Sequence, residues 1–148
     1  MGLVTLADAF LAFTYAQFIN LAETLLWIER PWGLKPPFPT AEEEVEDEGY
    51  HALLAALYVV PFAILYYVHP LKVVVLSVFV WFLNDTTWHF WAVNPRYYLQ
   101  WLRFYFNPRD RRVVWYARFG IGKFAVTPRR MFIVTIVRIA VLVLALCT

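Results

Sequence analysis

The sequence has little charge for its length. Of its 148 residues, 16% are Asp, Glu, Lys or Arg and 61% are hydrophobic. Soluble domains contain about 25% charged and about 45–50% apolar residues. A soluble domain of this size cannot bury so much apolar surface, so the composition predicts that lipid is the solvent for much of the protein.

Cysteine is almost absent, and several common motifs are missing. Cys147 is the only cysteine, which excludes an intrachain disulfide framework and a cluster of thiolate metal ligands. Residues 1–7 contain no Lys or Arg, and Asp8 interrupts the apolar run, which is unlike a cleavable signal sequence. The sequence contains no phosphate-binding glycine loop and no nucleophile elbow, so neither motif predicts an activity.

Four apolar stretches are prominent instead. A helix needs about 20 apolar residues to cross the hydrocarbon core of a bilayer. The stretches cover residues 3–28, 51–68, 71–93 and 131–147. We therefore predict an all-α integral membrane protein of one domain, in which four transmembrane helices form one bundle.

The segments between these stretches differ in character. Residues 31–39 hold four prolines, which predicts a stiff linker, and the acidic residues that follow have the spacing of a helix start at Thr40–Glu43. Residues 94–130 hold most of the Lys and Arg, interleaved with aromatic residues, as is typical of a segment at the membrane interface. We expect an amphipathic helix over 97–106. The pattern over 113–124 fits either a short hairpin or a second interfacial helix.

The short turn at His69-Pro70 predicts the topology. It places the acidic segment 29–50 and the basic segment 94–130 on the same side of the membrane. Because basic loops stay in the cytoplasm, we predict a multi-pass protein of the cell membrane with both termini outside.

The basic segment predicts the lipids that the chain meets. Arg103, Arg111 and Arg112 are candidates for binding the phosphate groups of anionic lipids on the cytoplasmic leaflet. This interpretation accounts for the basic segment without nucleic acid.

Ionisable side chains inside the apolar stretches are costly and form a functional hypothesis. At 1.5 Å per residue, Glu23, Asp85 and His89 lie in the cytoplasmic half, with His51 at the start of its stretch. Carboxylates and imidazoles bind zinc, iron and manganese. These four residues are therefore our candidate metal site. Glu48 is a further candidate, because Glu48 and His51 have the E-x-x-H spacing of di-iron bundles.

The same residues also have a purely structural interpretation. Arg138, near the middle of the last apolar stretch, needs a counter-ion, and Asp85 or Glu23 is at the right depth. His89 would then be a core histidine bonded to Asp85 or to a backbone carbonyl. A polar stripe in the first stretch is expected to face other helices rather than lipid; it consists of Gln17, Asn20, Glu23 and Thr24.

Three functional hypotheses follow. The first is an accessory or assembly subunit of a larger membrane complex, because the chain is small and carries no complete catalytic signature. The second is a membrane metalloenzyme acting on a lipid or its headgroup at the cytoplasmic face, where zinc, iron or manganese would activate water or oxygen. The third is a haem-binding electron-transfer subunit using His51 and His89, although no C-x-x-C-H site is present.

Overall fold

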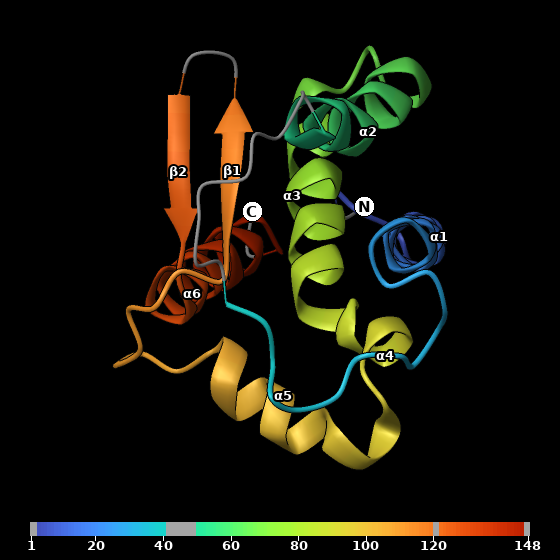
Figure 1. Ribbon diagram of the computed structural model, residues 1–148. Coiled ribbons are helices and arrows are strands. Elements are labelled where there is room, and N and C mark those ends of the chain that lie inside the picture. The colour runs from blue at the N-terminus through green and yellow to red at the C-terminus, as the bar shows by residue number, and fades with distance from the viewer. Residues whose placement is uncertain (1–2, 41–49, 120–121, 147–148) are drawn as a thin grey trace.

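A computed structural model of the chain describes residues 3–40, 50–119 and 122–146. The predicted acidic helix start, Glu48 and Cys147 lie outside this part. The long helices are α1 (Leu6–Trp27), α2 (Tyr50–Leu65), α3 (Pro70–Thr87) and α6 (Pro128–Leu146). Shorter elements are α4 (His89–Ala92), α5 (Tyr98–Tyr105) and the strands β1 (Trp115–Phe119) and β2 (Gly122–Val126). Figure 1 shows their arrangement.

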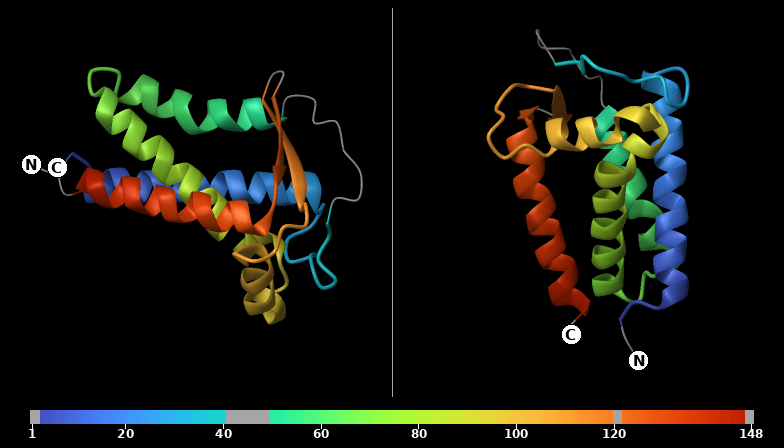
Figure 2. Two further views of the ribbon diagram at one scale, coloured as in Figure 1. Left: turned by 90° about the vertical axis from the view of Figure 1, so that its left-hand side faces the viewer. Right: turned by 90° about the horizontal axis from the view of Figure 1, so that it is seen from below.

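The helix α3 is the centre of the fold. The helices α1, α2 and α6 all pack against it, and the four helices extend between two ends of the molecule (Figure 2). Both chain termini lie at one end, and α5 and the β-hairpin lie at the other (Figure 2). At the start of α1, Thr5 and Asp8 cap each other's backbone N–H groups in a capping box.

The prediction of four transmembrane helices is wrong. Two helices are long and apolar enough to cross a membrane: α1 and the stretch Pro70–Ala92, which joins α3 to α4. The helix α2 has 16 residues, or about 24 Å of length, which is less than the roughly 30 Å of a bilayer core. The helix α6 begins before the apolar stretch and includes Arg129 and Arg130 as well as Arg138.

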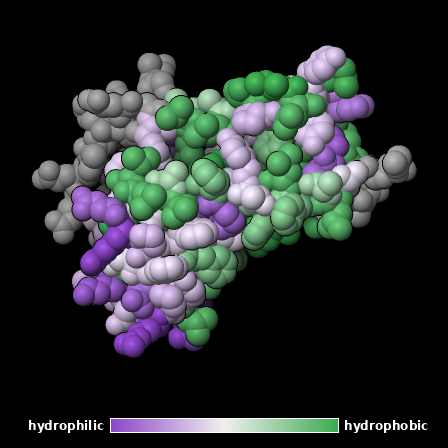
Figure 3. Space-filling model, turned by 90° about the vertical axis from the view of Figure 1, so that its right-hand side faces the viewer, coloured by the Kyte–Doolittle hydropathy of each residue, from purple (hydrophilic) through white to green (hydrophobic). Residues whose placement is uncertain are grey.

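The two long apolar helices are only partly buried within the fold. In their apolar stretches, 28% and 39% of the residues are buried, whereas a soluble core helix is mostly buried. Large side chains such as Leu6, Phe10 and Phe18 are exposed on α1. Hydrophobic side chains cover much of the helical part, and hydrophilic ones gather near the end that carries α5 (Figure 3). So much exposed apolar surface calls for apolar surroundings.

Of the two structures predicted for 113–124, the hairpin is present, with its strands at 115–119 and 122–126, so the fold is not all-α. The strands β1 and β2 are antiparallel, with Trp115 opposite Val126 and Phe119 opposite Gly122. The strand β1 also packs against α2. The helix expected over 97–106 is present as α5, with Trp101 and Tyr105 buried.

The proline-containing segment is bonded to the rest of the fold. Leu34 donates its backbone N–H to Ala92 (2.9 Å) and accepts one from Asn94 (2.9 Å). The ring of Phe38 packs edge-on against Trp101, with centroids 5.1 Å apart. We call residues 31–40 the strap, because they connect the end of α1 to the end of α4 and to α5.

Candidate functional site

A large cavity lies between α2, α3 and α6, bounded at one end by the hairpin and the strap. Its volume is about 1420 Å³. Along α3 its lining runs from Val73 to Asp85, which is about 18 Å at 1.5 Å per residue. Val59 on α2 and Ile133 on α6 line it and remain half-exposed. The cavity is therefore open to the surroundings between α2 and α6.

The lining is apolar along most of its length and polar at one end. Val73, Val74 and Val78 line it toward the termini. Toward α5, the wall carries a group of polar side chains that four helices contribute: Glu23, Tyr50, His51, Asn84, Asp85 and Arg138. These residues meet because three helix ends lie at the same end of the molecule. Glu23 is near the end of α1, His51 near the start of α2 and Asp85 near the end of α3.

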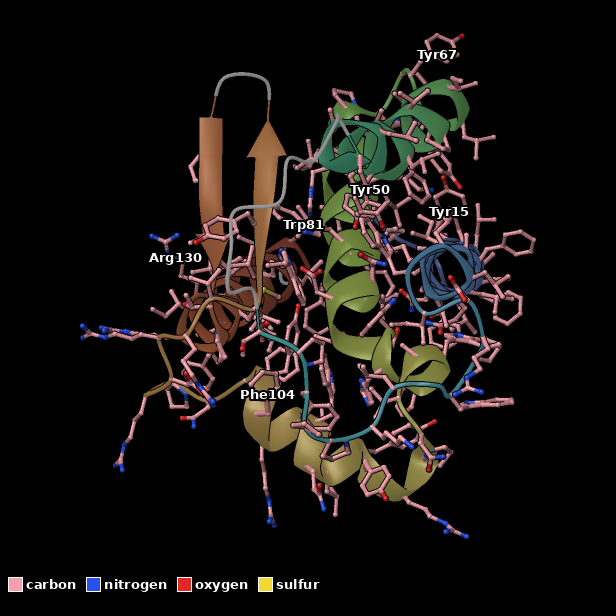
Figure 4. The ribbon with its side chains drawn as sticks, in the orientation of Figure 1. Tyr15, Tyr50, Tyr67, Trp81, Phe104 and Arg130 are labelled. Atoms are coloured by element: carbon pink, nitrogen blue, oxygen red, sulfur yellow. The ribbon has the colours of Figure 1, made fainter. Side chains whose placement is uncertain are left out.

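An ion pair links α3 to α6 in this wall. Arg138 donates from Nη1 to Asp85 Oδ2, so of the two carboxylates considered for Arg138 the structure pairs it with Asp85. The guanidinium also stacks over the Trp81 ring, 3.7 Å from its centroid, which adds a cation–π attraction. Trp81 lies on the side of α3 that faces α6 and the hairpin (Figure 4). Arg138 is 5% exposed, so the pair offsets the cost of a lone buried charge.

Asn84 organises a second set of polar contacts next to the ion pair. Its Nδ2 donates to Asn20 Oδ1 (2.7 Å) and to Glu23 Oε2, while its Oδ1 accepts from the Tyr58 hydroxyl. Glu23 also accepts from the Tyr50 hydroxyl. This network joins α1, α2 and α3. Sequence reasoning found Asn20 and Glu23 but missed both tyrosines, whose polar tips sit on an otherwise apolar helix.

A further chain of hydrogen bonds holds α1 against α3 and α4. Gln17 and Asn20 both donate to Thr87 Oγ1, at 2.8 and 2.9 Å. Trp91 donates its indole N–H to Gln17 Oε1 at 3.0 Å. The predicted polar stripe of the first stretch therefore faces neighbouring helices, and its role here is to hold them together.

The structure separates the members of the candidate metal site. Glu23, His51 and Asp85 line the cavity, but His89 does not. The His89 ring is buried against Phe90 and Tyr98, with centroids 4.3 and 5.3 Å away. Within the described ranges, no three His, Cys, Asp or Glu side chains gather in an arrangement that could hold a metal ion. The metal and haem hypotheses therefore gain no support from this part of the chain.

The three arginines proposed for lipid phosphate lie around the end that carries α5. Arg103 and Arg111 are exposed. Arg112 pairs with Asp110 through Nη2–Oδ2 (2.6 Å) and Nε–Oδ1 (3.1 Å). This guanidinium lowers the pKa of the Asp110 carboxyl below its usual value. The Arg112 guanidinium is thus paired with a carboxylate of the same chain. Arg103 and Arg111 lie exposed on the surface.

Comparison of the chain with protein-family models, with curated proteins and with solved structures found no match.

Proposed function

We propose that this chain is a membrane protein that binds an amphipathic, lipid-like molecule in the cavity between α2, α3 and α6. The observation that carries the proposal is the cavity's size together with its division into a long apolar part and a polar end. About 1420 Å³ exceeds the roughly 300–1,000 Å³ of typical small-molecule sites. An apolar chain would lie beside Val59, Val74 and Ile133, and a polar end would meet the wall near Asp85 and Arg138.

The proposal includes an orientation in the membrane. The helix α1 and the stretch Pro70–Ala92, which are long and apolar enough to cross a bilayer, would lie in its apolar part. The end with Arg103 and Arg111 would face the cytoplasm, where basic residues are retained and anionic lipids attract them. In this orientation the opening between α2 and α6 faces lipid.

The test is to fill the apolar part of the cavity. Val74 lines the cavity on α3 and is 54% exposed, and Leu71 on the same helix is 57% exposed but does not line it. We expect Val74→Trp to lower strongly the amount of lipid that co-purifies with the full chain in dodecyl maltoside, measured by mass spectrometry of an organic extract. Leu71→Trp is the matched control and should leave it unchanged. Equal recovery from both variants and the parent protein would contradict the proposal.

A second candidate function is that of an accessory subunit in a larger membrane complex. The observation in its favour is α6, which packs against α3 and α5 but leaves Ile136, Val137 and Val143 exposed. An apolar face of this kind suits another membrane helix. The mass of the particle extracted from native membranes tests it, since a protein that carries lipid alone would show one chain plus detergent and lipid.

A further inference from the structure

Pro61 interrupts the main-chain hydrogen bonding inside α2. The helix continues through this residue to Leu65, but proline has no N–H, so the carbonyl of Leu57, four residues earlier, lacks its helical donor. The Tyr15 hydroxyl of α1 donates to this carbonyl at 2.9 Å. In apolar surroundings a carbonyl freed by proline must be satisfied by a neighbouring group. A contact between two helices therefore replaces a bond within one.

Pro61 also separates two parts of α2 with different surroundings. The residues of α2 that line the cavity all precede it: Tyr50, His51, Leu54, Ala55, Tyr58 and Val59. We call residues 50–60 the lining half of α2. Beyond the proline, Phe62 is 1% exposed, and Tyr66 in the following turn donates to Asp8 Oδ1 of α1 at 2.6 Å. One part of the helix is thus a cavity wall, and the other is anchored.

The lining half is held to α1 and α3 by hydrogen bonds from three tyrosine hydroxyls: Tyr15 to Leu57, Tyr50 to Glu23, and Tyr58 to Asn84. An apolar groove of about 240 Å³ lies between α1 and this half of α2. Leu53 and Leu57 line the groove and are 61% and 39% exposed. The packing between α1 and the lining half is therefore open, and directional bonds set the position of this half relative to α1.

We propose that the lining half of α2 is a movable wall that closes the cavity around its ligand, with Pro61 as the hinge and the Tyr15–Leu57 hydrogen bond as a latch. Helices bend at proline because a main-chain bond is missing there. The latch holds the lining half toward α1, in the open position seen here. When it is released, residues 50–60 pivot away from α1 and narrow the gap between α2 and α6. The proposal rests on the proposed function and adds how its ligand is enclosed.

The experiment measures distances from α6 to both parts of α2. Spin labels are attached at Leu53→Cys in the lining half and at Ile136→Cys on α6, in the full chain with Cys147→Ser, reconstituted in lipid nanodiscs. Both labelled positions are exposed, and neither lines the cavity. Pulsed electron paramagnetic resonance gives the distribution of distances. Ile64→Cys with Ile136→Cys is the reference pair, because Ile64 lies beyond Pro61 and is 71% exposed.

Tyr15→Phe then releases the latch. It removes the hydroxyl and keeps the ring, which packs edge-on against Phe62 with centroids 6.0 Å apart. We expect the distances from the lining half to shift toward shorter values, with the ratio of closed to open populations raised about threefold to tenfold, the effect of one lost hydrogen bond. The distances of the reference pair should stay as they are in the parent protein.

Two further variants separate the latch from a general structural role of Tyr15. In Pro61→Ala the carbonyl of Leu57 regains a main-chain donor, so adding Tyr15→Phe to this variant should not change the distances. Tyr67→Phe is the matched control, because Tyr67 is 80% exposed and extends away from the helices (Figure 4). It should give the distances of the parent protein.

The outcomes separate the hinge from the proposed function. If Tyr15→Phe leaves both pairs unchanged, shifts the reference pair equally, or acts as strongly in the Pro61→Ala variant, the hinge and latch are overturned. Lipid binding still stands in that case if Val74→Trp lowers the amount of co-purified lipid. If the distances shift as expected but Val74→Trp has no effect, α2 does pivot at Pro61 and the proposed function fails.

Discussion

Asn84 shows how a single amide can connect three helices in apolar surroundings. It is 3% exposed, and its two amide atoms bond to side chains of α1 and α2. The sequence places an asparagine at this depth but does not indicate its partners. One of them, Tyr58, comes from a helix whose rotation about its axis is set only by packing. The position of each residue along its helix therefore predicted the layer of polar side chains but not the hydrogen bonds between them.

The same distinction applies to the candidate site. Counting along straight helices placed Glu23, His51 and Asp85 at one level, and the structure brings these three to one cavity wall. His89 was expected on the face of Asp85, since residues four apart on one helix are neighbours. Instead, α3 ends at Thr87 and α4 turns away from its axis (Figure 1), so the imidazole packs among aromatic rings.

The Asp85–Arg138 pair provides a prediction at this scale. Asp85→Leu or Arg138→Met alone leaves one buried charge without its partner, and we expect each to lower the free energy of unfolding by about 3–5 kcal/mol. The double variant Asp85→Leu/Arg138→Met removes both charges and should recover most of this loss. Chemical unfolding in detergent, analysed as a double-mutant cycle, measures the coupling. Additive losses would mean that the pair contributes nothing as a pair.

At the scale of elements, hydropathy located the long helices but misplaced their ends. The apolar run 51–68 continues past α2, which ends at Leu65, because His69 closes a turn by donating its N–H to Tyr66 (2.8 Å) and Pro70 begins the next helix. The helix α6 begins at Pro128, a residue suited to a first helical turn, and so includes two arginines that the apolar run left out. These ends depend on turns and caps, to which a hydropathy pattern is insensitive.

The contacts of the strap could not be predicted either, because four prolines indicate a stiff segment but not the part of the chain that it packs against. Its Phe38 ring contacts Trp101 and Phe104. We expect Phe38→Ala to lower the free energy of unfolding by about 1–2 kcal/mol, the scale of an aromatic pair and part of its burial. Thermal unfolding followed by tryptophan fluorescence measures the change. Pro39→Ala, at the exposed neighbouring position, is the control, and an equal effect of both variants would show that the ring contacts add nothing.

At the scale of the whole molecule, composition correctly indicated a chain with apolar helices exposed over much of their surface. The number of spans did not follow from it, because that number depends on helix lengths and on where the arginines fall. The cavity could not be predicted from the sequence either. It exists because α2 and α6 pack on different sides of α3 and the hairpin covers one end, an arrangement set by contacts between distant segments.

The arginine-rich end leads to a prediction for the molecule in a membrane. Arg103 and Arg111 are exposed near α5, and each basic residue near an anionic surface contributes about 1 kcal/mol of attraction. We expect the melting temperature of the parent protein to be higher in nanodiscs containing phosphatidylglycerol than in pure phosphatidylcholine. Replacing both arginines by Gln should reduce this difference, and added salt should do the same. Lys35→Gln, an exposed basic position in the strap, is the single-charge comparison. A difference that survives both substitutions would rule out this surface.

The strap also has a consequence for how the chain is assembled. Its backbone bonds join Trp32 and Leu34 to residues 91–94, so their partners are synthesised about sixty residues later. During translation, α1 and the strap emerge while α3, α4 and α5 do not yet exist, and domains larger than a few elements fold as their distant contacts become available. The bonds between the two segments therefore form late in synthesis, and the apolar surface of the first helix stays uncovered until its neighbours have been made.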